Sequence, residues 1–222
     1  MHTIAVVSGG LDSVTLAHHL ADAGHRLELM SFDYGQRHRR ELELAAACAA
    51  RLDAPHHEVD LTSLAALLAG SSLTSVDVDV PDGHYAEENM SVTVVPNRNA
   101  IMISIAAGYA VNVGADAVAV GVHGGDHFVY PDCRPGFVRA IDTALFLANE
   151  GYAPAGFAVR APFVHWSKAD IVREGARLGV PWTQTWSCYK GGHAHCGTCG
   201  TCVERKEAFV LAGVTDPTDY ER

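Results

Sequence analysis

The stretch Thr3-Ile4-Ala5-Val6-Val7-Ser8-Gly9-Gly10-Leu11-Asp12-Ser13 decides the fold, because it joins a short β-branched strand to a helix through two glycines. Apolar spacing predicts that the helix runs from Asp12 to Ala23. The glycines let backbone N–H groups turn toward a ligand, and the positive end of the helix dipole favours an anion. The stretch therefore predicts a phosphate-binding loop, although it has neither the lysine and spacing of a Walker A loop nor the pattern G-x-G-x-x-G.

Asp12 has two interpretations within this loop. A carboxylate repels phosphate by itself, so it suits the loop if it helps to hold Mg²⁺ against a pyrophosphate. In the alternative, the glycines make only a tight turn and Asp12 caps the helix. The local residues do not decide between these two interpretations.

Beyond this loop, strands and helices alternate along the chain. This alternation predicts an α/β fold with a doubly wound, mostly parallel sheet, whose ligands bind at the carboxyl ends of the strands. Residues 70 to 95 have no sustained period and are predicted to form a long surface loop. The further strands are predicted at Leu27 to Phe32, His56 to Val59, Ala117 to Gly121 and Phe157 to Arg160. The further helices are predicted at Glu41 to Leu52, Leu64 to Ala69, Asn99 to Val113, Gly136 to Asn149 and Lys168 to Leu178.

Composition and charge exclude several classes of protein. Of the 222 residues, 48% are hydrophobic, which is enough to form a core and is not typical of a disordered chain. A formal net charge of −10 would repel a phosphate backbone, so a nucleic acid partner is not expected. The apolar start has no basic flank, and the longest apolar run, Ala100 to Val111, falls short of the roughly 20 residues that cross a bilayer. We therefore expect a soluble, cytoplasmic protein with no membrane partner.

Four of the six cysteines lie close together near the C-terminus and predict a metal site, because disulfide frameworks spread over a whole fold. Four thiolates can close a tetrahedral site with no open position, which predicts one structural Zn²⁺ per chain. A C-x2-C-x2-C run also suits an iron–sulfur cluster. His193 and His195 are interpreted as solvated loop residues and Cys48 as a small buried hydrophobe. The four clustered cysteines are Cys188, Cys196, Cys199 and Cys202.

Five separated motifs resemble those of the 7-cyano-7-deazaguanine synthase family, which belongs to the N-type ATP pyrophosphatase (PP-loop) superfamily. The motifs run in order over nearly the whole chain. The resemblance implies an adenine nucleotide alpha hydrolase-like, Rossmann-like domain over residues 1–181. A four-cysteine zinc-binding lobe follows over residues 182–222, with a closing helix from Val203 to Leu211. The motifs are Ser8 to Ser13, Phe32-Asp33-Tyr34-Gly35-Gln36-Arg37-His38, Val95-Pro96-Asn97-Arg98-Asn99, Tyr130-Pro131-Asp132-Cys133-Arg134 and the cysteine group.

The resemblance also implies a reaction in queuosine biosynthesis. From 7-carboxy-7-deazaguanine, ammonia and two ATP it gives 7-cyano-7-deazaguanine, two AMP and two pyrophosphates, because adenylation activates an oxygen that cannot leave unaided. The implied catalytic residues are Asp12, Ser13 and Lys168, which would reach the pyrophosphate, with Mg²⁺ spreading the developing charge. The implied ATP-binding residues are Val7, Ser8, Gly9, Gly10, Leu11, Asp12, Ser13, Val14, Thr15, Leu16 and Ala17.

Four polar residues are predicted to bind the acid substrate. The helix dipole disfavours an arginine at a helix start, so Arg98 indicates contact with a carboxylate or phosphate, with a surface salt bridge as the alternative. A planar purine acid offers a bidentate target for guanidinium and hydrogen-bond donors for Asp132. Cys133 is expected to line the same pocket. The four predicted residues are Arg98, Asp126, Asp132 and Arg134.

Two features of the sequence depart from the family pattern. Asn97 stands where glycine is expected, and the sequence from His123 to Val129 differs from that of other members.

Two other functions share part of this pattern. A PP-loop enzyme that thiolates tRNA would share the loop and the cysteines, but the negative charge and the lack of a basic stripe argue against it. A zinc-held nucleotide-binding module without catalysis is the other alternative. The sequence leaves a homodimer open.

Overall fold

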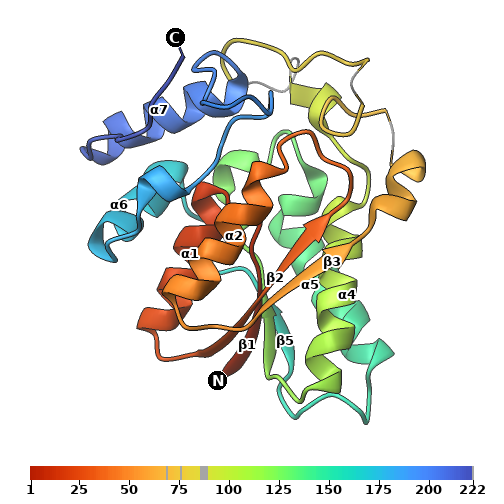
Figure 1. Cartoon of the computed structure of the whole chain (residues 1–222). Helices are drawn as coiled ribbons and strands as arrows, with labels where there is room; N and C mark the ends of the chain where they lie inside the picture. The colour runs from red at the N-terminus through yellow and green to blue at the C-terminus, as the bar shows by residue number, and fades with distance from the viewer. Residues whose placement is uncertain (69, 76, 86–89, 222) are drawn as a thin grey trace.

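The computed structural model, which describes residues 1–68, 70–75, 77–85 and 90–221, contains a five-stranded sheet between two layers of helices (Figure 1). The strand order is β3-β2-β1-β4-β5, and every neighbouring pair is parallel. The predicted α/β fold class is thus confirmed. The strands are β1 (His2–Val6), β2 (Arg26–Asp33), β3 (His56–Asp60), β4 (Ala117–Ala119) and β5 (Ala158–Arg160). The helices are α1 (Leu11–Asp22), α2 (Arg40–Arg51), α4 (Arg98–Asn112), α5 (Pro135–Ala148), α6 (Lys168–Arg177) and α7 (Gly200–Ala212).

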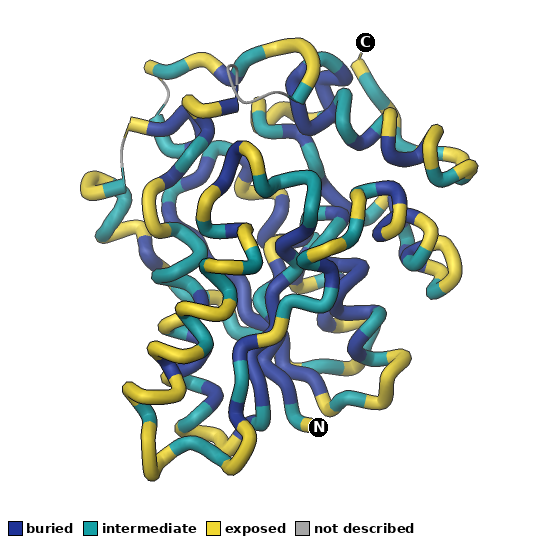
Figure 2. The backbone as a smooth tube through the Cα atoms, turned by 180° about the vertical axis from the view of Figure 1, so that it is seen from behind, coloured by how far each residue is buried: buried dark blue, intermediate teal, exposed yellow. Residues whose placement is uncertain are grey.

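The central strands are buried on both faces, as their β-branched and aliphatic sequences require. In β1 the side chains of Ile4 and Ala5 are fully buried, and β4 is buried along its whole length (Figure 2). On one face α1 and α2 pack over the sheet, and on the other face α4 and α5 do so (Figure 1). Helix α6 packs against α1. Because β2 and β4 flank β1 on opposite sides, the strand order reverses beside β1, and a crevice is expected there at the carboxyl ends.

The region after β3 differs from the prediction. A 3₁₀ helix over Thr62–Leu67 replaces the predicted helix at 64–69, and position 69 lies outside the described residues. The predicted surface loop at 70–95 includes positions 76 and 86–89, which also lie outside the described part. Within its described part, Leu73 and Met90 are almost fully buried, so this segment contributes to the core. An irregular segment can bury apolar residues that have no periodic spacing. The lack of a period in this segment therefore gave no indication of its burial.

The C-terminal region is tied to the rest of the chain at both of its ends. Helix α7 begins at Gly200, three residues earlier than predicted, because the helix N-cap is Cys199. Phe209 of α7 packs in the same apolar cluster as Leu11 of α1. The cysteine loop meets the 70–95 segment, where Gly83 N–H donates to Thr198 O at 2.9 Å and Asp82 accepts from Thr198 Oγ1 at 2.6 Å. The division at residue 181 stays a prediction.

Candidate active site

The turn between β1 and α1 is closed by its own hydrogen bonds. Ser8 N–H donates to Ser13 Oγ at 3.1 Å, and Ser13 Oγ–H donates to Gly10 O at 3.1 Å. Gly9 has a φ of +93°, and a Cβ there would lie 2.1 Å from the carbonyl oxygen of Glu41. Only glycine therefore fits this position. Gly10 is the N-cap of α1, so the interpretation of Asp12 as the helix cap is wrong.

A cavity of about 210 Å³ opens beside this turn, at the carboxyl ends of β1, β2 and β4. Its lining includes Val7, Ser8, Gly10, Leu11, Asp12 and Ser13 from the predicted ATP-binding set. The other members, Gly9, Val14, Thr15, Leu16 and Ala17, are not in the lining; the last four lie buried on the inner face of α1. The first helical turn faces the cavity, whereas the next turn packs on the sheet.

Lys168 stands between two carboxylates on one wall of the cavity. Its Nζ lies 2.9 Å from Asp12 Oδ2 and 3.0 Å from Glu204 Oε2, which comes from α7. Ser167 positions the lysine by starting α6 with a capping box, in which Ser167 Oγ accepts from Asp170 N–H at 3.2 Å. Burial raises the pKa of Asp12, but the charge and hydrogen bond of Lys168 and the other positive groups nearby together outweigh this effect and hold that pKa below its ordinary value. Burial lowers the Lys168 pKa, and the two carboxylates more than reverse the change.

His123 and Asp126 extend the same wall. The His123 ring is fully buried, and its Nδ1 accepts from Gly125 N–H at 3.1 Å. We therefore assign the proton of the neutral ring to Nε2, which faces Asp126 Oδ2 at 3.3 Å. Tyr85 O–H donates to the other oxygen of Asp126 at 2.7 Å. Asp12, His123, Asp126, Lys168 and Glu204 are called the phosphate-loop cluster below.

The phosphate-loop cluster does not fit a metal ion bound through His123. The ligand atoms of His123, Asp126 and Glu204 lie within 4.8 Å of one another, which alone would allow a shared ion. The Gly125 N–H, however, fixes the ring so that Nε2 carries a proton rather than a free lone pair. Lys168 Nζ, 3.5 Å from Nε2, already supplies a positive charge at this point.

A second group of polar residues lines the cavity at the end of β2 and the start of α2 and α4. In the motif from Phe32 to His38, Gln36 Oε1 accepts from Tyr34 N–H at 2.9 Å and Gln36 Nε2 donates to Phe32 O at 3.0 Å. These bonds shape the turn from which Tyr34 and His38 reach the cavity lining. Arg98 Nη1 donates to Tyr34 Oη at 3.3 Å, and His38 Nε2 lies 3.4 Å from Glu41 Oε2. Tyr34, His38, Glu41 and Arg98 are called the β2-end cluster below.

Burial dominates the electrostatics of the β2-end cluster. Burial lowers the pKa of His38 to about 3, and the nearby Arg98 guanidinium acts in the same direction. Burial raises the pKa of Glu41 to about 8, although Arg98 opposes this rise. The imidazole is thus uncharged at neutral pH. Arg98 lines the cavity, which agrees with its predicted position and not with the alternative of a surface salt bridge.

Two of the predicted substrate residues are not in the cavity lining. Asp132 Oδ2 accepts from Asn99 N–H at 3.1 Å, so it caps α4 from the neighbouring segment. Arg134 is exposed, and its Nε donates to His127 O at 2.6 Å. Neither side chain reaches the cavity lining, because the turn at Pro131–Cys133 directs only Cys133 inward, and the role of both residues in substrate binding stays a prediction. Asp126, by contrast, lines the cavity, as does Cys133.

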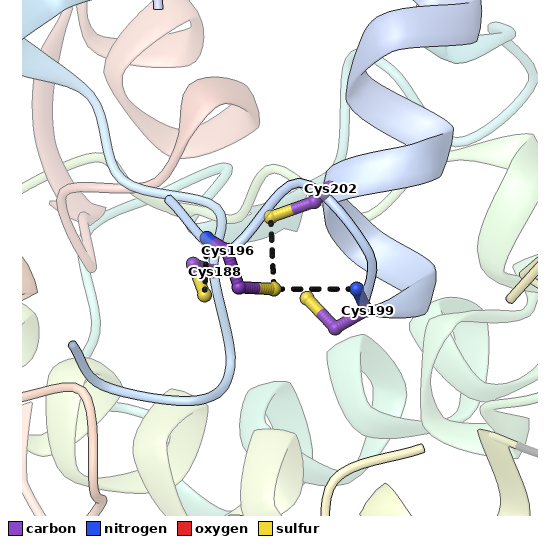
Figure 3. Close-up of side chains that lie close together, drawn as sticks. All are labelled: Cys188, Cys196, Cys199 and Cys202. Carbon is purple, nitrogen blue, oxygen red and sulfur yellow. Dashed lines mark hydrogen bonds between the residues drawn. The ribbon is translucent and has the colours of Figure 1, made fainter. Parts of the chain in front are cut away.

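The four clustered cysteines converge on one point, as Figure 3 shows. All four sulfurs lie within 4.8 Å of one another, and Cys196 Sγ is 3.9 Å from Cys202 Sγ. An ion that binds four sulfurs at about 2.3 Å in a tetrahedron separates them by about 3.8 Å, so the set fits a single ion. The interpretation of His195 as solvated is wrong. Its ring is buried against Trp186, and its Nε2 accepts from Ser187 N–H at 3.1 Å.

Several site residues were not found by sequence reasoning. Glu204 carries no signal, because its partner Lys168 lies in another helix. His38 ends the motif that begins at Phe32, and Glu41 follows three residues later. The only signal for this pair in the sequence is a histidine and a glutamate spaced by about one helical turn. Lys168, by contrast, was predicted from the family resemblance, and the structure shows the capping box of Ser167 and Asp170 that starts its helix.

The described part of the chain holds no helix long and apolar enough to cross a membrane.

The whole chain is similar to known proteins. The model of a family described as queuosine biosynthesis protein QueC matches residues 2–213. A protein of Rhizobium rhizogenes named 7-cyano-7-deazaguanine synthase is 64% identical over 221 residues, which cover 100% of this chain and 92% of that protein.

Two solved structures share the fold alone, at low sequence identity. NMN synthetase from Francisella tularensis aligns with a TM-score of 0.51 and 13% identity, over 96% of this chain and 77% of that one. A 4-thiouridine synthetase in a complex with RNA and bound ATP aligns with a TM-score of 0.50 and 16% identity, over 96% and 52%.

Proposed function

The chain belongs to the QueC family of queuosine biosynthesis proteins, and we propose that it converts 7-carboxy-7-deazaguanine and ammonia to 7-cyano-7-deazaguanine with two ATP. The proposed route has two adenylations. In the first, a carboxylate oxygen attacks the α-phosphorus of ATP and pyrophosphate leaves, after which ammonia displaces AMP to give the amide. In the second, the amide oxygen is adenylated and AMP departs to leave the nitrile.

One observation carries this proposal: the predicted anion-binding turn, the half-buried ammonium group of Lys168 and the half-buried guanidinium of Arg98 line one cavity. The turn and the start of α1 offer backbone N–H groups and a positive helix end to phosphates. Lys168 is placed to neutralise the departing pyrophosphate, and Ser13, which holds the turn closed, keeps those N–H groups aimed. Elsewhere in the lining, Arg98 is the group that can pair with the acid carboxylate in a bidentate manner.

Asp12 also fits a role toward Mg²⁺. Its Oδ2 is taken by Lys168, but its buried Oδ1 has no hydrogen-bond partner among the described residues. A buried carboxylate oxygen without a partner is unfavourable, and an oxygen-seeking cation would satisfy it. When bound, Mg²⁺ would spread the negative charge that develops on the phosphates.

We further propose that the four cysteines hold one structural Zn²⁺. Four sulfurs at the separations of a single tetrahedral ion leave no position open for substrate. A four-iron cluster would hold its four cysteine sulfurs farther apart than one ion does. This places the iron–sulfur alternative second. Thiolates of this kind persist in the reducing cytoplasm, which is the proposed location.

The proposed partners are therefore small molecules, namely the deazapurine acid, ATP and ammonia. A nucleic acid partner is not part of the proposal, because the net charge of −10 opposes it. The decisive experiment incubates the purified chain with 7-carboxy-7-deazaguanine, ammonium, Mg²⁺ and ATP and follows AMP and nitrile by chromatography. We expect two AMP per nitrile. ATP left intact would indicate a binding module, and AMP that forms with tRNA but not with the acid would indicate a thiolating enzyme.

A further inference from the structure

The β2-end cluster contains a histidine–glutamate pair that the roles above do not use. His38 is 3% exposed, and its Nδ1 has no hydrogen-bond partner among the described residues. Glu41 is also buried, and both residues line the cavity. A buried ring nitrogen without a partner is unfavourable unless a ligand satisfies it. The pair therefore marks a subsite.

The pair presents hydrogen-bond acceptors to this subsite. His38 Nε2 lies 3.4 Å from Glu41 Oε2, so we place the single ring proton on Nε2, facing the carboxylate. Nδ1 then carries a free lone pair, and Glu41 Oε1 carries others. Two acceptors on a buried wall select a ligand that donates several hydrogen bonds.

The position of the pair identifies where that ligand stands in the reaction. A Cβ at Gly10 would lie 3.9 Å from Glu41 Oε1, and the Gly9 backbone touches the Glu41 carbonyl oxygen. The carboxylate thus borders the turn to which phosphates are proposed to bind. Like charges at such a distance repel, so an ionised Glu41 requires a cation beside it.

We propose that Glu41 and His38 bind the ammonium ion that supplies the nitrile nitrogen and that Glu41 accepts its proton. This inference rests on the proposed function. Ammonium donates four hydrogen bonds and is small enough for the edge of a cavity that also admits two larger substrates. Arg98, from the same cluster, is proposed to hold the acid carboxylate, so the reacting carbon lies within the same part of the cavity.

Two other ligands suit the pair less well. The guanine-like edge of the acid also donates hydrogen bonds, but it lies at the far end of the ring system from the carboxyl group, which must reach ATP. Mg²⁺ prefers nearly octahedral oxygen coordination, whereas this pair offers one carboxylate and one ring nitrogen. The Arg98 guanidinium would also repel a divalent ion more than a monovalent one.

The chemical step balances with these groups. Ammonium gives one proton to the Glu41 carboxylate, which frees the nitrogen lone pair. That pair forms the C–N bond with the acyl-adenylate, and the C–O bond to AMP breaks with its electrons on AMP. The second proton leaves the nitrogen with the departing AMP phosphate, and the amide remains. Glu41 then returns its proton to solvent.

The test compares ammonium with hydroxylamine as the nucleophile in the wild type and in Glu41→Gln. Hydroxylamine is uncharged at neutral pH and needs no proton acceptor before attack, so it traps the acyl-adenylate directly as hydroxamate. We expect the variant to lose at least about a hundredfold more in amide formation than in hydroxamate formation, which is the range of a general base. Glu41→Asp should recover part of the amide reaction. The matched control is Glu43→Gln on the exposed face of α2, which should retain both reactions.

Several results would overturn the inference. A parallel loss of amide, hydroxamate and acid-dependent ATP–pyrophosphate exchange would assign Glu41 to the acid or to ATP. An unchanged dependence of amide formation on ammonium concentration would remove Glu41 from the step. His38→Phe deletes the Nδ1 acceptor and should raise the KM for ammonium, and an unchanged KM would contradict its role. A wild type without acid-dependent exchange would refute the proposed function instead.

Discussion

The two polar clusters beside the cavity differ in how their charges are compensated. In the phosphate-loop cluster, the Lys168 ammonium lies within 3.0 Å of two carboxylates, and its charge is held in place. In the β2-end cluster, the nearest partner of the Glu41 carboxylate is an uncharged imidazole at 3.4 Å. Paired charges suit a group that must stay fixed against phosphates. A carboxylate whose nearest partner carries no positive charge suits a group that exchanges protons.

We expect the phosphate-loop cluster to depend on the proposed metal site, because Glu204 reaches Lys168 from α7, whose N-cap is Cys199 of the four-cysteine group. The largest effect is therefore expected from Cys199→Ser. The free energy of unfolding should fall by about 5 kcal/mol or more, since metal binding energy at such a site is folding energy. Denaturant unfolding measures the loss, and elemental analysis should find one zinc per wild-type chain.

Cys48→Ala is the matched control, because this buried cysteine lies in α2 away from the cluster. It should reduce the free energy of unfolding by only about 1 kcal/mol and leave the metal content unchanged. Stoichiometric iron with acid-labile sulfide in the wild type would contradict the zinc assignment. A Cys199→Ser protein as stable as the wild type would separate the metal from the fold.

Removal of the central charge should have the next largest effect. Lys168→Met keeps the side-chain length but leaves Asp12 and Glu204 unpaired, which should reduce the free energy of unfolding by about 3 kcal/mol. AMP formation should fall about a thousandfold, because the charge that stabilises the departing pyrophosphate is lost. Urea unfolding and AMP release measure the two effects.

Arg173→Met in the same helix is the comparison for this variant. Arg173 forms a half-exposed ion pair with Asp170 at 2.6 Å, and pairs of that kind contribute only about 0 to 1 kcal/mol. Equal losses for the two variants would show that Lys168 is no more important than a surface charge.

The two clusters also differ in how far the sequence predicts them. The turn from Ser8 to Ser13 is local, and its glycines and alternating elements predict both the loop and the parallel sheet. Lys168 begins a helix with a capping signal of its own. Glu204, however, reaches Lys168 only through the packing of α7 against α6, and no local pattern encodes that contact.

The substrate residues show the same limit. Asp132 and Arg134 flank Cys133 in one motif, yet only Cys133 lines the cavity, because the tight turn at Pro131–Cys133 sends neighbouring side chains in different directions. A motif identifies a segment but does not fix the direction of each side chain. The spacing of apolar residues over 70–95 has no period and therefore predicts a surface loop. The burial of Leu73 depends instead on contacts with residues that are distant in the sequence.

The pH dependence of stability sharpens the comparison, with a smaller expected effect. The pKa of Glu41 rises from 4.5 unfolded to about 8 folded, so its penalty grows as pH rises from 4.5 to 8. The pKa of His38 falls from 6.5 to about 3, so its contribution is complete above pH 6.5 and is lost as pH falls toward 3. The two slopes oppose each other between pH 4.5 and 6.5. Above pH 6.5, stability should fall by about 2 kcal/mol up to pH 8.

Urea unfolding at half-unit pH intervals measures this profile. Glu41→Gln should flatten the decline between pH 6.5 and 8, because the amide does not ionise. His38→Phe should flatten the acid limb instead. A decline that persists unchanged in Glu41→Gln would mean that another titratable group governs this range.

The smallest effect is expected at Asn97, which precedes Arg98 of the β2-end cluster. Asn97 has φ +58° and ψ +14°, the left-handed region that glycine and asparagine tolerate best, so either residue type suits this N-cap. Asn97→Gly should therefore change the free energy of unfolding by less than about 1 kcal/mol, whereas Asn97→Ala should lower it by about 1 kcal/mol. Because Asn97 makes no side-chain cap, the difference between the two variants reports backbone strain rather than a lost hydrogen bond. Thermal unfolding measures that difference, and equal stability of the alanine and glycine variants would mean that the left-handed conformation at position 97 costs alanine nothing.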